Sequence, residues 1–267
     1  MSFIVNPYVY AVAGCADADA NAFLSATGIT DPTISGAICT LVTSMKANGT
    51  WAKCNAIYPM VGGTATTHMY NLKNPSNTNA AFRLGFVGGW THSANGALPN
   101  GTNAYADTFL NPTTTLSINS SHISYYVRTN IAENRYDMGA GADPSAYIII
   151  QSRSTLGNAR FIVYTGDLND VANSDSRGLF ISNRTSSTVI NGFKNTSKIL
   201  NLTQTAIARP NRSIFLGALN FQGTNGPVLF SSKQCAFSTI GSGLTDAEAT
   251  NLYNTIQTFQ TTLGRQV

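Results

Sequence analysis

Short segments in which apolar and polar residues alternate dominate the chain from about residue 82 onward, and linkers that carry Gly, Asn, Asp or Pro separate them. Alternation with a period of two places successive side chains on opposite faces of a strand. Many short strands joined by such turns are typical of an all-β sandwich or barrel. The predicted strands cover residues 82–90, 115–121, 123–130, 146–153, 159–166, 178–184, 198–205, 213–221 and 227–233.

A helix is predicted over about residues 31–48. Asp31 is a favourable N-cap, and Pro32 suits the first helical position because its missing N–H would have no partner there. Apolar residues follow at three- and four-residue spacing, and Gly49 stands just past the end. We therefore expect an amphipathic helix with one apolar face.

A second helix is predicted over residues 245–263. Thr245 and Glu248 have the spacing of a capping box, and Asp246 places negative charge at the positive helix start. An apolar stripe runs along this segment to Gly264, which ends it. The stripe has to pack on a partner, and the sandwich or the first helix would serve.

These patterns divide the chain into an N-terminal attachment segment, residues 1–78, and a sandwich with its closing helix, residues 79–267. The extended apolar N-terminus is predicted to be a docking arm, because an unpaired apolar strand needs a cover. The alternative is that it pairs within its own domain. The assembly residues of this arm are Phe3, Ile4, Val5, Tyr8, Val9 and Tyr10.

The composition excludes several classes of function. Charged residues make up 10 % of the chain, against about 25 % in typical domains, and Ser, Thr, Asn and Gly supply the polarity. The net charge of +4 is scattered, so we expect no binding of nucleic acid. No CxxC, HxH or DxDxDG-like pattern occurs, so we expect no metal and no cofactor.

Targeting signals are also missing from the sequence. No apolar run reaches the roughly 18 residues that a membrane span needs, so no membrane insertion is expected. The start MSFIVNPYVYAVAG lacks the charged region and apolar stretch of a signal peptide. We expect synthesis in a cytoplasm and release, if any, by a route such as cell lysis.

The four cysteines are Cys15, Cys39, Cys54 and Cys235, and they are widely spaced. We expect buried free thiols that act as small apolar residues. The alternative is a Cys39–Cys54 disulfide, against which assembly in a cytoplasm argues.

Several segments, taken in order, resemble the LamG-like (laminin-G, pentraxin or concanavalin A type) jelly roll over about residues 82–260. The resemblance implies an antiparallel jelly-roll β-sandwich, which is mostly a binding and display scaffold, and it places an NG turn at the end of the hairpin in 178–195. The low charge and the Ser, Thr, Asn and Gly content also resemble virion proteins of tailed bacteriophages. The segments are NGALPNGTNAYADTFLNP (95–112), SINSSHISYYVRTN (117–130), GLFISNRTSSTVINGFKN (178–195), SIFLGALNFQGTNGPVLF (213–230) and IGSGLTDAEATNLY (240–253).

Catalytic patterns are weak, and we expect no catalytic residues. A glycosidase needs two carboxyl groups about 5–10 Å apart, for which Glu133 and Asp137 are candidates. The alternative is a pair of solvated loop carboxylates that contact Arg135. The ExDxxE-type strand of the glycosidase members does not occur.

The glycine-rich stretch GAGAD (139–143) is predicted to be a flexible loop and not a phosphate-binding loop, because no helix start follows it to bind an anion.

The histidines do not indicate chemistry either. A hydrolase triad needs Ser or Cys with His and Asp, but no GxSxG motif is present. We expect His68, His92 and His122 to be hydrogen-bonding or interface residues.

Aromatic residues beside loops rich in Asn and Asp are the predicted glycan contacts. The apolar faces of sugar rings stack on aromatic rings, and Asn or Asp side chains bond the hydroxyl groups. The alternative for each aromatic residue is packing in the sandwich core or in a hairpin. The candidates are Trp90, Tyr105, Tyr136 and Tyr164.

The leading expectation is a non-enzymatic structural or display protein of a bacteriophage virion, such as a capsid-decorating protein or a tail- or head-fibre component. Its partners would be other virion proteins and itself, because weakly charged surfaces associate readily into homo-oligomers. The alternative is a lectin-like adhesion module that recognises host surface glycans, and the third hypothesis is a glycan-cleaving enzyme.

Overall fold

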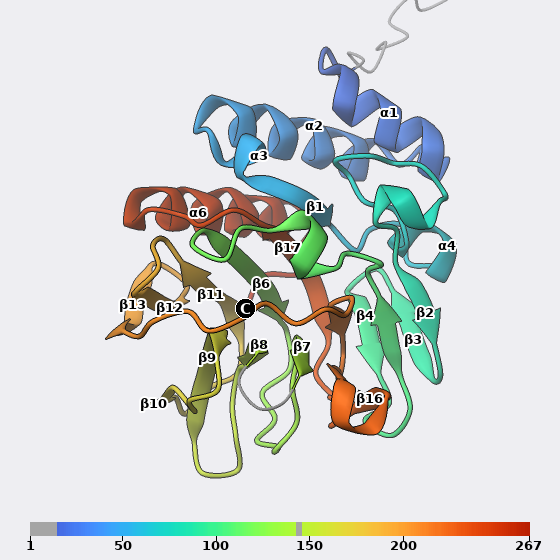
Figure 1. Ribbon diagram of the computed structural model, residues 1–267. Helices are drawn as coiled ribbons and strands as arrows, with labels where there is room; N and C mark the ends of the chain where they lie inside the picture. Colours follow the sequence, from blue (N-terminus) through green and yellow to red (C-terminus); the bar gives the residue numbers. More distant parts are fainter. Residues whose placement is uncertain (1–14, 143–145) are drawn as a thin grey trace, which may run out of the picture.

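Two antiparallel sheets pack face to face in the computed structural model, which describes residues 15–142 and 146–267 (Figure 1). The main core lies between the sheets and contains buried side chains from both, such as Tyr125 and Phe180 from one and Ile148 and Phe161 from the other. The predicted mostly-β sandwich is therefore confirmed, together with a helical segment at each end of the chain.

Sheet 1 has eight strands, with β17 and β6 near its centre. Strand β1 comes from the N-terminal part of the chain and pairs with β17, so residues before 79 contribute a strand to the sandwich. The strands of sheet 1 are β13 (Ser197–Thr203), β12 (Val189–Lys194), β11 (Gly178–Arg184), β6 (Ser121–Val127), β17 (Cys235–Gly241), β4 (Gly96–Pro99), β3 (Trp90–Ser93) and β1 (Cys54–Tyr58).

Sheet 2 has nine strands, and β7 is central because β8, β14 and β15 all pair with it. Strand β15 runs parallel to β7, whereas the other pairs are antiparallel. The strands are β10 (Asp170–Ala172), β9 (Asn158–Thr165), β8 (Ala146–Gln151), β7 (Met138–Ala142), β14 (Phe215–Leu216), β5 (Tyr105–Asp107), β2 (Gly85–Val87), β15 (Leu219–Phe221) and β16 (Gly226–Val228).

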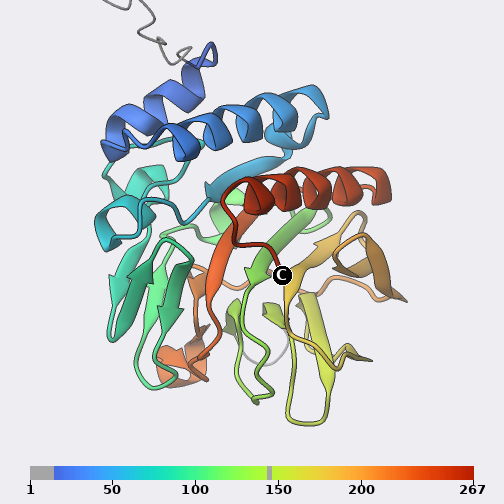
Figure 2. The same cartoon turned by 180° about the vertical axis from the view of Figure 1, so that it is seen from behind.

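The long helices lie on the side of sheet 1 and bury its outer face (Figures 1 and 2). Helix α2 (Pro32–Ala47) and helix α6 (Asp246–Thr262) run side by side, and side chains such as Leu41 and Ile256 pack with Tyr126 and Phe237 of the sheet. Both helices begin at the predicted caps, since Asp31 accepts from the Ile34 N–H and Thr245 forms its capping box with Glu248.

The remaining helices are short, apart from α1, and none of the described helices is long and apolar enough to cross a membrane. They are α1 (Ala18–Thr27), α3 (Thr50–Lys53), α4 (Ala65–His68), α5 (Pro112–Thr115), and the 3-10 turns η1 (Asn79–Ala81) and η2 (Gln222–Thr224).

Three local predictions are wrong. Residues 115–121 do not form a strand, because Asn111 caps helix α5 and a turn at 117–120 delays the start of β6 until Ser121. Residues 139–142 are not a loop but most of β7, whose five residues are all buried. The Asn191–Gly192 pair lies inside β12 instead of in a turn. Its glycine serves packing, because a side chain at position 192 would collide with the ring of Phe161.

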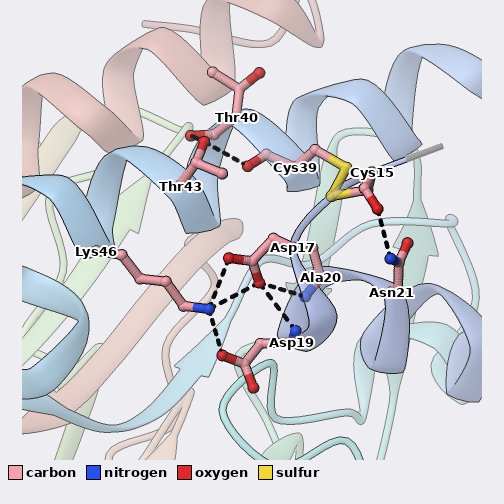
Figure 3. Close-up of a disulfide and its surroundings, with 9 residues drawn as sticks. All are labelled: Cys15, Asp17, Asp19, Ala20, Asn21, Cys39, Thr40, Thr43 and Lys46. Carbon is pink, nitrogen blue, oxygen red and sulfur yellow. Dashed lines mark hydrogen bonds and ion pairs between the residues drawn. A yellow bond between two sulfur atoms is a disulfide. The ribbon is translucent and has the colours of Figure 1, made fainter. Parts of the chain in front are cut away.

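The cysteine prediction also needs correction, because Cys15 and Cys39 form a disulfide (Figure 3). The bond ties the residues before α1 to α2, and Lys46 of α2 adds ion pairs to Asp17 at 2.7 Å and Asp19 at 2.6 Å. The hydrogen bond from Lys46 is the main cause that lowers the pKa of Asp17.

The other two thiols, Cys54 and Cys235, are buried and free, as predicted. Burial raises the pKa of each to about 12. The alternative pairing of Cys39 with Cys54 is therefore wrong.

Candidate functional site

The outer face of sheet 2 carries an apolar hollow of about 450 Å³, on the opposite side of the sandwich from the long helices. Its walls come from strands β8 and β9, the β9–β10 connection, the β15–β16 hairpin and Tyr136, which lies two residues before β7. We call it the sheet-2 hollow, and its lining residues are Tyr136, Tyr147, Ile149, Ile162, Gly166, Leu168, Leu219, Phe221, Thr224, Val228 and Leu229.

The floor of the sheet-2 hollow follows from strand alternation. In β8, Ile148 and Ile150 point into the core between the sheets, so Ile149 points to the outer face. Ile149, Ile162 and Leu219 together form a small buried apolar cluster on that face. A ligand that enters the hollow therefore meets a dry aliphatic surface.

Aromatic side chains stand around this floor. Tyr136, Tyr147 and Phe221 are half-buried and pack against the aliphatic cluster. The rings of Tyr147 and Phe221 are stacked, and their planes are 14° from parallel. Rings that are held in place against a floor offer flat apolar contact surfaces at a low cost in conformational entropy.

An ion pair beside the hollow contacts the hydroxyl group of Tyr136. Asp170 accepts from Arg160 Nε at 2.6 Å and from its second terminal nitrogen at 2.8 Å. The first terminal nitrogen of Arg160 donates to the hydroxyl oxygen of Tyr136 at 3.0 Å, which orients that ring. The hydrogen bond from Arg160 to Asp170 raises the pKa of Arg160, so the guanidinium stays charged.

Tyr136 is the predicted glycan residue that lies in the sheet-2 hollow. The prediction of a glycan contact at Tyr164 is wrong, because its side chain is fully buried in the core and its hydroxyl donates to Ser121 Oγ at 2.9 Å. A ligand at the surface does not reach it. The cause is a positive φ at Tyr164, which turns this side chain inward at the end of β9.

Trp90 is the first residue of β3 and Tyr105 the first residue of β5, and neither lines the hollow. The indole N–H of Trp90 donates to the carbonyl oxygens of Val87 and Tyr105, both at 3.1 Å. The ring of Tyr105 stacks on Phe215 at a centroid distance of 4.6 Å. Both residues are half-buried, and both make contacts that stabilise this end of the sandwich.

Sequence reasoning missed Tyr147 and Phe221. The segment AYIIIQ carried the signal for Tyr147, since alternation puts residues 147 and 149 in one row opposite the core row of 148 and 150. The signal for Phe221 was weaker, because Gly217 interrupts the predicted strand over 213–221 and splits it into β14 and β15.

Glu133 and Asp137 do come together, but around Lys233 and not Arg135. Lys233 Nζ lies 3.3 Å from Asp137 Oδ1 and 3.4 Å from Glu133 Oε1, whereas Arg135 is exposed. Burial raises the pKa of Glu133, but Lys233 and hydrogen bonds from Ser232 and Ser231 outweigh it and lower the pKa overall. The pair is therefore not a set of solvated loop carboxylates.

The histidines make internal hydrogen bonds. His68 and His92 face each other, with their Nδ1 atoms 2.9 Å apart. His122 is fully buried, between the Ser242 carbonyl and the Thr239 hydroxyl. Burial lowers the pKa of His68 to about 3 and that of His122 to about 4. Among the described residues, no three His, Cys, Asp or Glu side chains gather in a way that would hold a metal ion.

A second hollow of about 580 Å³ lies between the α1–α2 turn and the end of α6. No aromatic side chain lines it. Its carboxylate, Asp31, already accepts the Ile34 N–H as the cap of α2. This hollow therefore lacks the flat aromatic walls that the sheet-2 hollow offers.

No family model matches the sequence, and no curated protein does. Among solved structures, the chain is similar to one of botulinum neurotoxin type C, described for its interaction with two ganglioside molecules, with a TM-score of 0.51 and 9 % identity. The match covers 79 % of this chain and 53 % of the toxin chain, so this chain spans about half of that protein.

Two further solved structures are similar at lower scores. Domain 4 of the arabinanase AbnA from Geobacillus stearothermophilus, in complex with arabinotriose, has a TM-score of 0.45 and 15 % identity over 75 % of this chain and 98 % of its own. A mutant Trypanosoma rangeli sialidase that displays trans-sialidase activity has a TM-score of 0.47 and 10 % identity over 82 % and 39 %. At 9 % identity, the likeness to the neurotoxin structure shows a shared β-sandwich fold and nothing more.

Proposed function

We propose that this protein is a non-enzymatic carbohydrate-binding module and that the sheet-2 hollow is its binding site. The observation that carries the proposal is the aliphatic floor flanked by the rings of Tyr136, Tyr147 and Phe221. The C–H face of a pyranose ring is flat and apolar, so it stacks on such rings. The hydroxyl oxygen of Tyr136 accepts from Arg160, which leaves its O–H to donate to the polar edge of a sugar.

The arrangement of carboxylates favours binding over hydrolysis. Cleavage of a glycosidic bond needs an acid and a second carboxyl group facing the substrate. Among the described residues, Asp170 is held by Arg160, and Asp137 is fully buried against Lys233. None of the described lining residues of the hollow is acidic. We therefore assign no catalytic residue.

The fold is compatible with this role. The botulinum neurotoxin with a similar sandwich depends for cell entry on ganglioside molecules, which carry glycans. The long helices cover the outer face of sheet 1, so the hollow lies on the other sheet, where strands position a site more precisely than loops do.

A glycan array followed by titration calorimetry tests the proposal. The full chain is expected to retain a defined set of glycans, and Phe221→Ala and Tyr136→Ala are expected to weaken the best of them. Tyr253→Ala is the matched control, because this half-buried tyrosine lies on α6 beyond the opposite sheet. Absence of binding to every glycan, or equal weakening in all three variants, would contradict the proposal.

We further propose that the module is displayed on a bacteriophage virion, where it contacts other virion proteins and further copies of itself. The Cys15–Cys39 disulfide supports this role, since disulfides persist on virion and cell surfaces and are rare inside cells.

The predicted docking arm, residues Phe3 to Tyr10, lies outside the described residues. Deletion of residues 1–12 should lower the oligomer mass measured by light scattering and leave glycan binding intact; unchanged mass would count against the arm.

A further inference from the structure

A lysine, an aspartate and a glutamate meet where the β16–β17 connection crosses the start of β7. The side chains of Lys233 and Asp137 are completely shielded from solvent, and that of Glu133 is 16 % exposed. Lys233 Nζ contacts Asp137 Oδ1 at 3.3 Å and Glu133 Oε1 at 3.4 Å. Burial of both charges this far from water carries a desolvation cost, which offsets much of their Coulomb attraction.

Hydrogen bonds from the backbone and from serine hydroxyls fix both carboxyl groups. The Ser152 N–H donates to Asp137 Oδ2 at 2.6 Å, and the Ser231 hydroxyl lies 2.9 Å from Oδ1. Glu133 accepts from the Ser232 N–H at 3.0 Å and from the Ser232 hydroxyl at 2.7 Å. The amine and the carboxyl group are thus held in contact with almost no freedom, which is the situation that accelerates a reaction between neighbours.

We propose that Lys233 and Asp137 form an intramolecular amide bond, with Glu133 as the proton carrier. The bond would replace a buried ion pair by a neutral amide. Its N–H would donate to Glu133, and its carbonyl oxygen would keep the bond from the Ser152 N–H. The step needs no oxidant, metal or further reactant.

The reaction balances as ammonium plus carboxylate giving amide plus water. One proton passes from Nζ to Glu133 and then, through the Ser231 hydroxyl that lies between the two carboxyl groups, to Asp137 Oδ1. This leaves a neutral amine and a carboxylic acid. The Nζ lone pair then adds to Cγ, and the C=O electron pair moves onto Oδ2. A second proton moves from Nζ through Glu133 to Oδ1, the electron pair on Oδ2 re-forms the C=O bond, and the Cγ–Oδ1 bond breaks with its electrons to release water.

The surrounding groups suit each part of this step. The Ser152 N–H points at Oδ2, where negative charge develops in the tetrahedral intermediate, as an oxyanion donor does. Ser231 lies 2.9 Å from the departing Oδ1 and 3.0 Å from Glu133 Oε1, so its hydroxyl donates to one of them at a time. The partial exposure of Glu133 provides a path by which the released water leaves.

The bond would join residues that are 96 positions apart. Asp137 directly precedes β7 of sheet 2, and Lys233 lies two residues before β17 of sheet 1. A covalent link here would tie the two sheets together at the starts of β7 and β17. It would hold the fold closed under force or proteolysis, in addition to the disulfide on the helical side.

The mass of the full, purified chain tests the proposal directly. After reduction of the disulfide, the intact protein should weigh one water molecule less than its sequence. Trypsin should release peptide 136–153 joined to peptide 213–265, because an acylated Lys233 resists cleavage. A preparation that keeps its full mass after long incubation would overturn the proposal, and so would a water loss that is confined to one unlinked peptide.

Variants assign the roles. Lys233→Met should keep its full sequence mass, whereas Lys198→Met, which removes a lysine paired with Asp246 near the surface, should still lose water. Glu133→Gln preserves the size of the side chain but not its proton acceptor, so it should form the bond far more slowly. If Glu133→Gln lost water as fast as the wild type, Glu133 would not be the proton carrier. The masses of the wild type and of Glu133→Gln decide the matter even if Lys233→Met does not fold.

Discussion

Tyr147 and Phe221 stack across a single glycine, with their ring centroids 6.2 Å apart. Both residues are register partners of Gly141, Tyr147 on the β8 side and Phe221 on the β15 side. A side chain at position 141 would collide with the ring of Tyr147. Gly141 thus lets two aromatic rings from separate strands lean over β7 and form a wall of the sheet-2 hollow.

Phe221→Ala should weaken glycan binding by roughly tenfold to thirtyfold, which corresponds to about 1.4–2 kcal/mol. The variant removes one stacking surface and loosens the ring of Tyr147. Titration calorimetry on the best glycan from the array measures the change, and urea unfolding checks that the fold is retained. An affinity that stays within twofold of the wild type would show that the glycan does not bind against this wall.

Burial of His122 should make the protein less stable in mild acid. Its Nδ1 contacts the Ser242 carbonyl oxygen, which only accepts, so Nδ1 carries the proton and the neutral Nε2 accepts from the Thr239 hydroxyl. Protonation of Nε2 would set two donors against each other unless the Thr239 hydroxyl turns away. Burial is the main cause that lowers the pKa of His122 to about 4.

The sign follows from linkage. The unfolded chain binds a proton at this histidine near pH 6.5 and the folded chain only near 4, so the stability is fully present above pH 6.5 and is lost as the pH falls toward 4. Between pH 7 and pH 5, His122 should account for a loss of about 2 kcal/mol. Urea unfolding of the wild type and of His122→Gln at pH 7 and at pH 5 measures this loss of stability. An equal loss in both proteins would show that His122 does not cause it.

The limits of prediction from sequence lie where contacts are non-local. Helices α2 and α6 were predicted to within about two residues, because Asp31 and the Thr245–Glu248 box act on their own neighbours. Strand β11 matches its predicted residues 178–184, since its side chains are buried on both faces and the segment carries a strong β pattern. Strand β7 was missed because glycine and alanine give no such pattern.

The site was predictable only in part for the same reason. Tyr136 was named, but its neighbours in the hollow come from β8 and β15, and nothing in the sequence indicates that these strands flank β7. The contact between Lys233 and Asp137 likewise depends on the order of strands in space. The partner of Cys39 was wrong because Cys15 reaches it through the packing of the segment before α1 on α2.

Loss of the Cys15–Cys39 disulfide should destabilise the helical layer by about 3 kcal/mol, because the cross-link closes a loop with a separation of 24 residues. Cys39→Ser should therefore unfold at lower urea concentration than the wild type. Cys235→Ala is the control for a cysteine change that leaves the disulfide in place. Alkylation in denaturant without reductant should label two thiols, Cys54 and Cys235, and labelling of all four would contradict the cross-link.

Two glycine substitutions should change stability in opposite directions. Gly192→Ala places a Cβ against the ring of Phe161 in the core, and overpacking of this kind costs about 1–3 kcal/mol. Gly36→Ala lies on the exposed side of α2, where a Cβ meets nothing within 4 Å, so it should stabilise the protein by about 0.5–1 kcal/mol through helix propensity. Urea unfolding of both variants measures the difference. If Gly192→Ala left the free energy of unfolding unchanged, close packing of Phe161 against β12 would not be the reason for the glycine at position 192.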